Sequence, residues 1–119
     1  MATERSLEAM TAALLRFRRE RDWEQFHNPK DQCLSLSLEA AELLELTQWK
    51  NGAELLAHLQ QHRDRVGEEL ADVLGWVLLI ANDLRIDLPD AFWKKLEQNE
   101  RKYPADKSRG SADKYTRYE

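Results

Sequence analysis

Hydrophobic residues recur at intervals of three and four along most of this chain, and no segment shows the alternation typical of a β-strand. The first such stripe predicts a helix that ends in the charged run 16–22, with Thr3 or Ser6 as its N-cap. Further helices are expected at about residues 30–49, 53–61, 63–84 and 89–102. The pattern therefore predicts an all-α protein whose four main helices form a four-helix bundle.

Turn-forming residues separate the expected helices. Asn28 precedes Pro29 and is therefore disfavoured in the α region, which predicts a turn before the second helix. Gly52 is expected to end that helix, because glycine readily adopts the left-handed conformation found after a last helical turn. Asp87 is the candidate cap of a helix that has Pro89 in its first turn.

Composition indicates a single soluble domain. The 119 residues are 42% hydrophobic and 34% charged, and we expect a domain over 1–104 followed by a polar tail over 105–119. A net charge of −4 argues against a surface for nucleic acid. The longest apolar stretch, 73–81, is too short to span a membrane. A single cysteine, Cys33, excludes an intramolecular disulfide and is consistent with a cytoplasmic protein.

Two pairs of carboxylates interrupt the two most hydrophobic helices. Glu39 and Glu42 form the first pair, and Glu69 and Asp72 form the second, each at a spacing that places both acids on one helix face. Both helices are apolar around most of their circumference, which is typical of buried helices. Buried acids would repel one another and lose hydration unless a cation lay between them. The alternative is that each pair lies on a solvated helix face.

The candidate ligands favour a hard divalent cation. Carboxylate oxygens suit Mg²⁺, and also Mn²⁺, better than zinc or copper. Di-iron bundles need Glu-x-x-His on two helices, whereas Glu42 and Asp72 stand at the corresponding positions here. Because Mg²⁺ usually binds together with substrate phosphates, the expected substrate is a nucleotide. His58 and His62 have a spacing that can bind metal, but without an acidic partner they are expected to be surface residues.

Longer segments around the acids resemble a known family. Two of them are similar to the MazG-like group of all-α NTP pyrophosphatases: EAAELLELTQWK at 39–50 and EELADVL at 68–74. Four more are similar to its dCTP pyrophosphatase branch: ERDWEQFH at 20–27, DLP at 87–89, NERKYP at 99–104 and KYT at 114–116. The resemblance implies a Mg²⁺-dependent hydrolase that converts a nucleoside triphosphate, in this branch dCTP, to the monophosphate and diphosphate.

The resemblance also implies roles for individual residues. The two acidic pairs would hold the metal, and Glu39 or Glu42 would position the attacking water. Aromatic, amide and basic side chains would bind the substrate: Trp23, His27, Trp49, Lys50, Trp76, Asn99, Lys102, Lys114 and Tyr115. His27 and Asn99 are expected to discriminate cytosine from other bases, and the lysines to meet the charge of the leaving diphosphate. Trp76 stands where the branch often has tyrosine, which affects the depth of the base pocket.

The family assembles as dimers or as tetramers built from dimers, so a homodimer or homotetramer is expected, without nucleic acid or membrane partners. Three alternatives remain open. The base preference could be broader or different, including modified dCTP, dUTP or dTTP. The chain could bind nucleotide or metal as a regulator without turnover. It could also be a structural helical oligomer whose acids pair with arginines drawn from Arg16, Arg18, Arg19 and Arg21.

Overall fold

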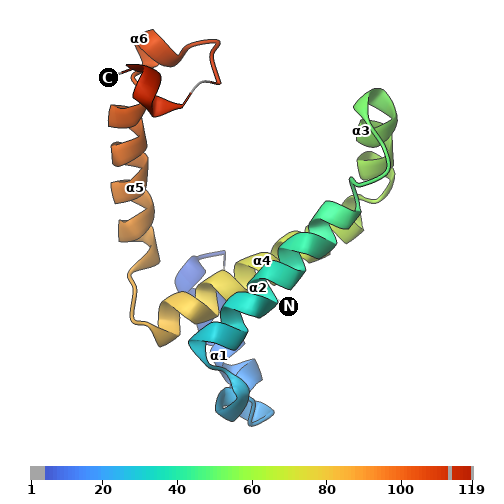
Figure 1. Cartoon of the computed structure of the whole chain (residues 1–119). Helices are drawn as coiled ribbons and strands as arrows, with labels where there is room; N and C mark the ends of the chain where they lie inside the picture. Colours follow the sequence, from blue (N-terminus) through green and yellow to red (C-terminus); the bar gives the residue numbers. More distant parts are fainter. Residues whose placement is uncertain (1–4, 113, 119) are drawn as a thin grey trace. The chain divides into compact units, whose positions relative to one another are not determined.

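A computed structural model describes residues 5–112 and 114–118, and these residues contain helices and no β-strand. The elements are α1 (Leu7–Glu20), η1 (Glu24–Phe26), α2 (Pro29–Glu45), α3 (Gly52–Gln61), α4 (Arg63–Asp83), α5 (Leu88–Lys102), α6 (Ala105–Ser108) and η2 (Tyr115–Tyr118), where η marks a 3₁₀ helix (Figure 1). The all-α prediction is confirmed for the described part of the chain. Among these helices, none is long and apolar enough to cross a membrane.

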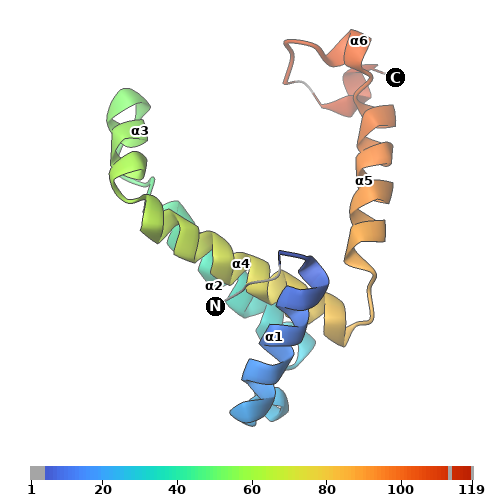
Figure 2. The same ribbon diagram turned by 180° about the vertical axis from the view of Figure 1, so that it is seen from behind.

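The chain divides into two compact units, one ending at Arg85 and the other beginning at Ile86. In the first unit, α2 and α4 lie side by side in both views (Figures 1 and 2). Helix α1 packs on α4, and α3 leads directly into the start of α4. Leu78, Leu79 and Ala81 of α4 are the buried hydrophobic residues of the described chain. The predicted four-helix bundle and the predicted boundary at residue 104 remain predictions.

Three helices begin where the sequence predicts, because a polar side chain caps each one. Ser6 Oγ accepts a hydrogen bond from the backbone N–H of Ala9 at 3.1 Å, and Ser6 is therefore the N-cap of α1. Asn28 caps α2 in the same way, and Asp87 caps α5. Each cap satisfies a backbone donor that has no partner inside its helix.

Helix α2 ends at Glu45, earlier than the predicted end at residue 49. The hydroxyl of Thr47 donates to the carbonyl of Leu44 at 2.8 Å, and the Thr47 N–H donates to the same oxygen at 2.9 Å. Such three-residue hydrogen bonds tighten the chain into a turn and stop the helix. Gly52 does adopt the left-handed conformation, with φ of 54°, but it begins α3 rather than ending α2.

The apolar flanks of α2 and α4 are not buried within a single chain, contrary to the prediction. Leu34, Leu38 and Leu44 of α2, and Leu70 of α4, are each more than half exposed. The physical reason is that each helix covers only the side that faces the other. These four exposed leucines are together called the leucine flank below.

The second unit contains α5, α6 and η2. Helix α5 is amphipathic, and its neighbouring rings Phe92 and Trp93 meet edge to face at 5.3 Å. Contacts join α5 to η2. Part of the predicted polar tail is thus helical, because α6 follows Pro104 directly and η2 lies near the C-terminus.

Candidate active site

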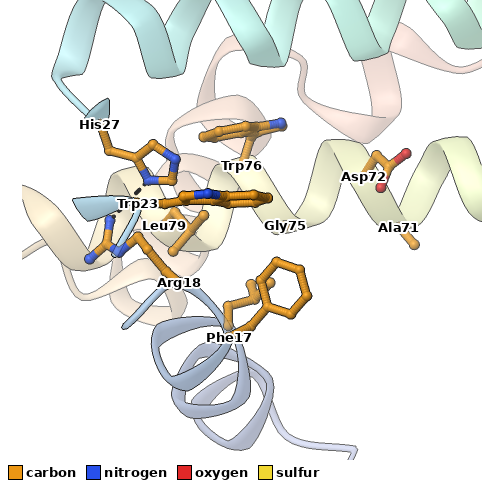
Figure 3. Close-up of a pocket in the computed structure, with 10 residues that line it drawn as sticks. Phe17, Arg18, Trp23, His27, Ala71, Asp72, Gly75, Trp76 and Leu79 are labelled. Carbon is orange, nitrogen blue, oxygen red and sulfur yellow. Dashed lines mark hydrogen bonds between the residues drawn. The ribbon is translucent and has the colours of Figure 1, made fainter. Parts of the chain in front are cut away.

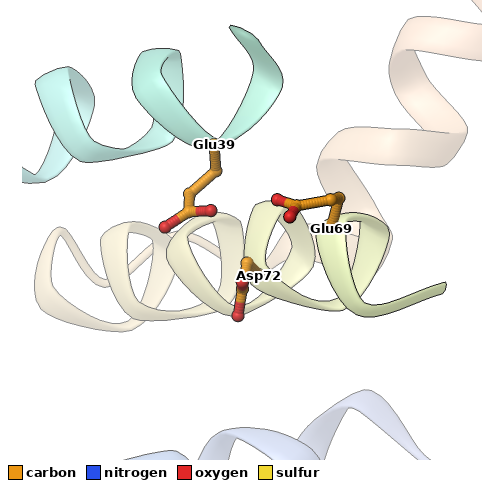
Figure 4. Close-up of side chains that lie close together, drawn as sticks. All are labelled: Glu39, Glu69 and Asp72. Carbon is orange, nitrogen blue, oxygen red and sulfur yellow. The ribbon is translucent and has the colours of Figure 1, made fainter. Parts of the chain in front are cut away.

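Three of the four predicted acids, one on α2 and two on α4, bring carboxylate oxygens close together. Glu39 reaches from α2 towards α4, where Glu69 and Asp72 lie one turn apart (Figure 4). One carboxylate oxygen of each residue lies within 4.8 Å of the other two. Ligand atoms at about 2.0–2.1 Å from one Mg²⁺ ion lie at most about 4.2 Å apart, so small side-chain rotations would bring the three oxygens into one coordination sphere. We call these three residues the carboxylate cluster.

Two oxygens of the carboxylate cluster are buried without a hydrogen-bond partner among the described residues. They are Glu39 Oε2 and Glu69 Oε2. A buried acceptor that lacks a partner is costly in free energy, and such groups are rare in folded proteins. Arg65 Nε approaches the other oxygen of Glu69 only to 4.0 Å. A cation bound by the cluster would satisfy both unpartnered oxygens.

Burial and mutual repulsion raise the pKa of two carboxyl groups of the cluster. Burial raises the pKa of Glu39 to about 7, and the negative charges of Asp72 and Glu42 add to the shift. Burial also raises the pKa of Glu69, and contact with the Glu42 carboxyl adds to it. Glu42 therefore lies beside the cluster although its own side chain is exposed. Without a cation, the site relieves its charge repulsion by taking up protons.

The donor set fits a hard divalent cation. All three converging ligands are carboxylates, and the cluster contains no histidine or cysteine. The residues that would hold Mg²⁺ or Mn²⁺ are therefore Glu39, Glu69 and Asp72. Glu42 is outside the three-way convergence, so its predicted role as a fourth ligand stays a prediction.

A largely apolar pocket adjoins the cluster through Asp72. Its volume is about 260 Å³. The lining residues come from α1, α4 and the segment around η1 (Figure 3): Leu14, Phe17, Arg18, Trp23, His27, Ala71, Asp72, Gly75, Trp76 and Leu79. Pockets for complete drug-sized ligands measure roughly 300–1,000 Å³. This one therefore suits a single ring system, with the remainder of the ligand outside it.

Aromatic side chains give the pocket its character. The rings of His27 and Trp76 meet edge to face with centroids 5.2 Å apart. Trp23 meets Phe17 in the same manner at 5.7 Å. The Trp23 N–H donates to the carbonyl of Arg18 at 3.1 Å, which folds the chain back over the end of α1 and brings its indole to the pocket. The structure thus brings three of the predicted substrate-binding residues, Trp23, His27 and Trp76, to one pocket, and their roles there remain predictions.

Gly75 provides open space in the pocket wall. It lies on α4 between Asp72 and Trp76, and a β-carbon placed there would lie 4.0 Å from the two terminal methyl groups of Leu14. That distance is an ordinary van der Waals contact, so the absence of a side chain is not forced by a clash. The glycine instead leaves room beside Asp72.

A polar network behind the pocket was not predicted. Arg18 makes a two-pronged ion pair with Asp83, at 2.8 and 3.0 Å, and Gln32 donates to the same carboxylate at 2.7 Å. The hydrogen bond from Arg18 holds the pKa of Asp83 down at about 2. The network joins the ends of α1 and α4 to the start of α2. Two features of the sequence could have suggested this pair. Asp83 follows Trp76 by seven residues and so lies on the same helix face, and Arg18 follows Leu14 by one turn.

Other predicted site residues lie elsewhere. Trp49 is 84% exposed in the turn after α2, and Lys50 pairs with Glu54 at 3.3 Å; neither lines the pocket. Four predicted substrate-binding residues belong to the second unit: Asn99, Lys102, Lys114 and Tyr115. Their roles remain predictions. Arg18 also bears on the structural alternative, because it pairs with Asp83 and not with an acid of the carboxylate cluster.

Comparison with known proteins agrees with this geometry. The sequence model of the MazG-like family matches residues 34–117, a range that includes both acidic pairs. The chain belongs to the MazG-like family. Membership confirms the resemblance expected from the two acidic segments, and it places the carboxylate cluster within the part of the chain that the family shares.

Individual relatives extend the MazG-like match. The chain is 43% identical to dCTP pyrophosphatase 1 of Bos taurus, over 97% of this chain and 69% of the relative. It is also 43% identical to dCTP pyrophosphatase 1 of Homo sapiens, over 95% of this chain and 68% of the relative. A crystal structure of a pyrophosphatase from Archaeoglobus fulgidus superimposes with a TM-score of 0.80, at 37% identity, covering 87% of this chain and 97% of that chain.

Proposed function

We propose that this MazG-like chain hydrolyses dCTP to dCMP and diphosphate, with Mg²⁺ bound at the carboxylate cluster. The observation that carries the proposal is the position of Asp72, which belongs both to the cluster and to the lining of the aromatic pocket. One ligand can therefore place a ring in the pocket and phosphates at the acids. Identity to dCTP pyrophosphatases over almost the whole chain supports this reaction and this base.

Each acid has a defined task in this reaction. Glu39, Glu69 and Asp72 would hold the cation, which supplies positive charge to phosphate oxygens when bound. Glu39 or Glu42 would accept a hydrogen bond from the attacking water and so aim its oxygen at the α-phosphorus. The water oxygen then bonds to phosphorus as the link to the bridging oxygen breaks. Diphosphate leaves with that oxygen, and the proton released by the water passes to the carboxylate.

The aromatic pocket would hold the base. Indole rings stack on any base, whereas hydrogen bonds distinguish one base from another. Trp23 and Trp76 would supply stacking surface, and His27 would supply a polar contact with the cytosine edge. Asn99 is proposed to contact base or sugar, and the three lysines named from the sequence to meet the charge of diphosphate.

We also propose that the chain works as a homo-oligomer, a dimer or a tetramer. The leucine flank exposes large apolar side chains along α2 and α4, and burying such area against a second copy would be favourable by about 25 cal/mol per Å². A second copy presents the same apolar side chains, so the two flanks could cover each other about a two-fold axis. A cytoplasmic location is proposed because the free nucleotide pool lies there.

A nucleotide panel tests the proposal. Wild-type protein with Mg²⁺ is offered dCTP, dUTP, dTTP and dATP, and both products are identified. We expect dCMP and diphosphate in equal amounts, with dCTP turned over fastest. Release of dCDP and phosphate, or no release at all, would contradict the pyrophosphatase assignment. Equal rates for all four nucleotides would defeat only the choice of cytosine.

A pair of neighbouring variants tests the cluster. Glu69→Gln removes a buried charge of the cluster while keeping the size of the side chain, so turnover should fall by at least about a hundredfold. Glu68→Gln is the matched control, since Glu68 is exposed on the same helix and lies outside the cluster. Its activity should equal that of the wild type. Glu42→Gln then decides whether Glu42 takes part, because only a participating residue lowers the rate.

A further inference from the structure

His27 shares a hydrogen bond with Arg18, and the direction of that bond is set by chemistry. Arg18 Nη1 lies 3.4 Å from His27 Nδ1 (Figure 3, dashed line). Arginine has only donors, so the nitrogen of histidine must accept. An imidazole nitrogen accepts only when it carries no hydrogen. His27 is therefore neutral in this arrangement, with its single hydrogen on Nε2.

The Arg18 guanidinium is held firmly in place. Both of its outer nitrogens donate to Asp83, and Arg18 itself is only 8% exposed. Gln32, which is 1% exposed, donates to the same Asp83 carboxylate from α2. Three helices thus position one donor against His27. Because arginine keeps its proton at any ordinary pH, this donor cannot turn into an acceptor.

The rest of the His27 ring faces the aromatic pocket. Trp76 approaches the ring edge to face, and Trp23 lines the same cavity. In Figure 3 the second ring nitrogen of His27 lies on the side away from Arg18, towards Trp76. A ligand in the pocket would therefore meet Nε2, while Nδ1 stays engaged behind it.

We propose that Arg18, oriented by Asp83 and Gln32, is a positioning residue that fixes His27 as the tautomer presenting one N–H donor to the base. The consequence of this inference rests on the proposed function. If the pocket holds the base, it selects a base edge that offers an acceptor, such as a ring carbonyl or an unprotonated ring nitrogen. Cytosine offers both groups side by side. The opposite tautomer would present an acceptor and would favour a base edge with a donor.

Nitrogen NMR of the nucleotide-free protein tests the tautomer directly. In uniformly ¹⁵N-labelled wild type, long-range ¹H–¹⁵N correlations should give a pyridine-like shift for His27 Nδ1 and a pyrrole-like shift for Nε2. Replacing Arg18→Met together with Asp83→Asn removes both charges at once, which avoids leaving one buried charge unpaired. In that variant the two shifts should move towards each other, since part of the population now carries its hydrogen on Nδ1. Arg18→Gln is the second variant, in case the double replacement does not fold, because its amide offers both a donor and an acceptor and so no longer selects one tautomer.

Kinetics supplies the second readout. Loss of one neutral hydrogen bond to the base should raise KM for dCTP by about 2- to 12-fold, with a smaller change in kcat. Arg19→Gln is the matched control, because Arg19 is the exposed neighbour on α1, and it should leave both the nitrogen shifts and KM unchanged. A hydrogen on Nδ1 in the wild type would overturn the proposal. Unchanged shifts and KM in both Arg18 variants would also overturn it. The shifts are measured without nucleotide, so they decide the tautomer even where the wild type hydrolyses no dCTP.

Discussion

Asp72 and Trp76 lie one helical turn apart on α4 and line the same pocket. Asp72 also contributes an oxygen to the carboxylate cluster, while Trp76 packs edge to face against His27. One face of one helix therefore carries both a proposed ligand for a cation and a proposed surface for a base. In the proposed function this arrangement would link metal binding to nucleotide binding, and the predictions below follow from it and from the surrounding contacts.

Divalent metal should stabilise the fold. A ligand that binds only the folded protein raises stability, by about 2.7 kcal/mol at one hundred times its dissociation constant. We therefore expect Mg²⁺ or Mn²⁺ to raise Tm over that of protein treated with EDTA, measured by differential scanning calorimetry. Glu69→Gln should abolish the rise, whereas Glu68→Gln should keep it. An equal Tm with and without metal would argue against a cation site.

The metal-free protein should lose stability as pH rises from about 4.5 to 7. Glu39 has a pKa of about 7 in the folded protein against 4.5 for an ordinary glutamate, so the unfolded chain releases its proton first. Deprotonation in this window therefore favours unfolding, and the effect levels off above pH 7. Urea midpoints measured across this range with EDTA provide the check. Saturating Mg²⁺ should flatten the slope, and a midpoint that rises with pH would contradict the assignment.

Below pH 4 the opposite trend is expected, because of Asp83. Its pKa is about 2 in the folded protein against 3.8 for an ordinary aspartate, so its stabilising effect is complete above 3.8 and is lost as pH falls towards 2. Asp83→Ala should lower the free energy of unfolding at neutral pH by about 3–5 kcal/mol, since it leaves the buried Arg18 unpaired. Glu97→Ala breaks an exposed pair with Arg101 and is the control, with an expected loss within about 1 kcal/mol. Equal losses in urea titrations would contradict this contrast.

Removing the Trp76 indole should weaken nucleotide binding more than turnover. Stacking of a base on an aromatic ring contributes about 1–3 kcal/mol, which corresponds to roughly 5- to 150-fold in affinity. We expect Trp76→Ala to raise KM for dCTP within that range, measured by steady-state kinetics. Trp76→Tyr keeps an aromatic ring and should recover most of the loss. If alanine leaves KM unaltered, the base does not lie against Trp76.

A charge placed on the leucine flank should dissociate the oligomer. Leu38 is 65% exposed in the single chain, and in an oligomer a glutamate there would bury an unpaired charge. Leu38→Glu should therefore shift the mass measured by light scattering towards the 14.0 kDa of one chain. Ser37→Glu is the control on the neighbouring exposed polar position. A wild type that already has the mass of one chain would contradict the oligomer proposal.

Local features of the fold were predictable because they depend on neighbouring residues. Helical periodicity located α1 to α5 but not α6 or η2. Ser6 and Asp87 marked two helix starts through their capping chemistry, and the turn expected at Asn28 and Pro29 marked a third. The end of α2 was placed too late, since periodicity does not register the competition of the Thr47 hydroxyl for a backbone carbonyl. The exposed leucine flank was missed as well, because an apolar pattern does not say whether its cover comes from the same chain.

The candidate site was predictable only in part. Acids at three-residue spacing inside apolar helices pointed to Glu39, Glu69 and Asp72, and these do converge. Arg18 and Asp83 are 65 positions apart, and spacing alone does not select one arginine among several in a charged run. Their pairing depends on how α1 crosses α4, which is a property of tertiary packing.

The absence of a side chain at Gly75 sets helix stability against space for a ligand. Glycine in a helix is less favourable than alanine by about 1 kcal/mol, and here a methyl group would meet Leu14 at an acceptable distance. A search for heat-resistant variants would thus readily select Gly75→Ala. The same methyl group would take up space beside Asp72. The variant would therefore be more stable than the wild type but would accept only smaller ligands in the pocket.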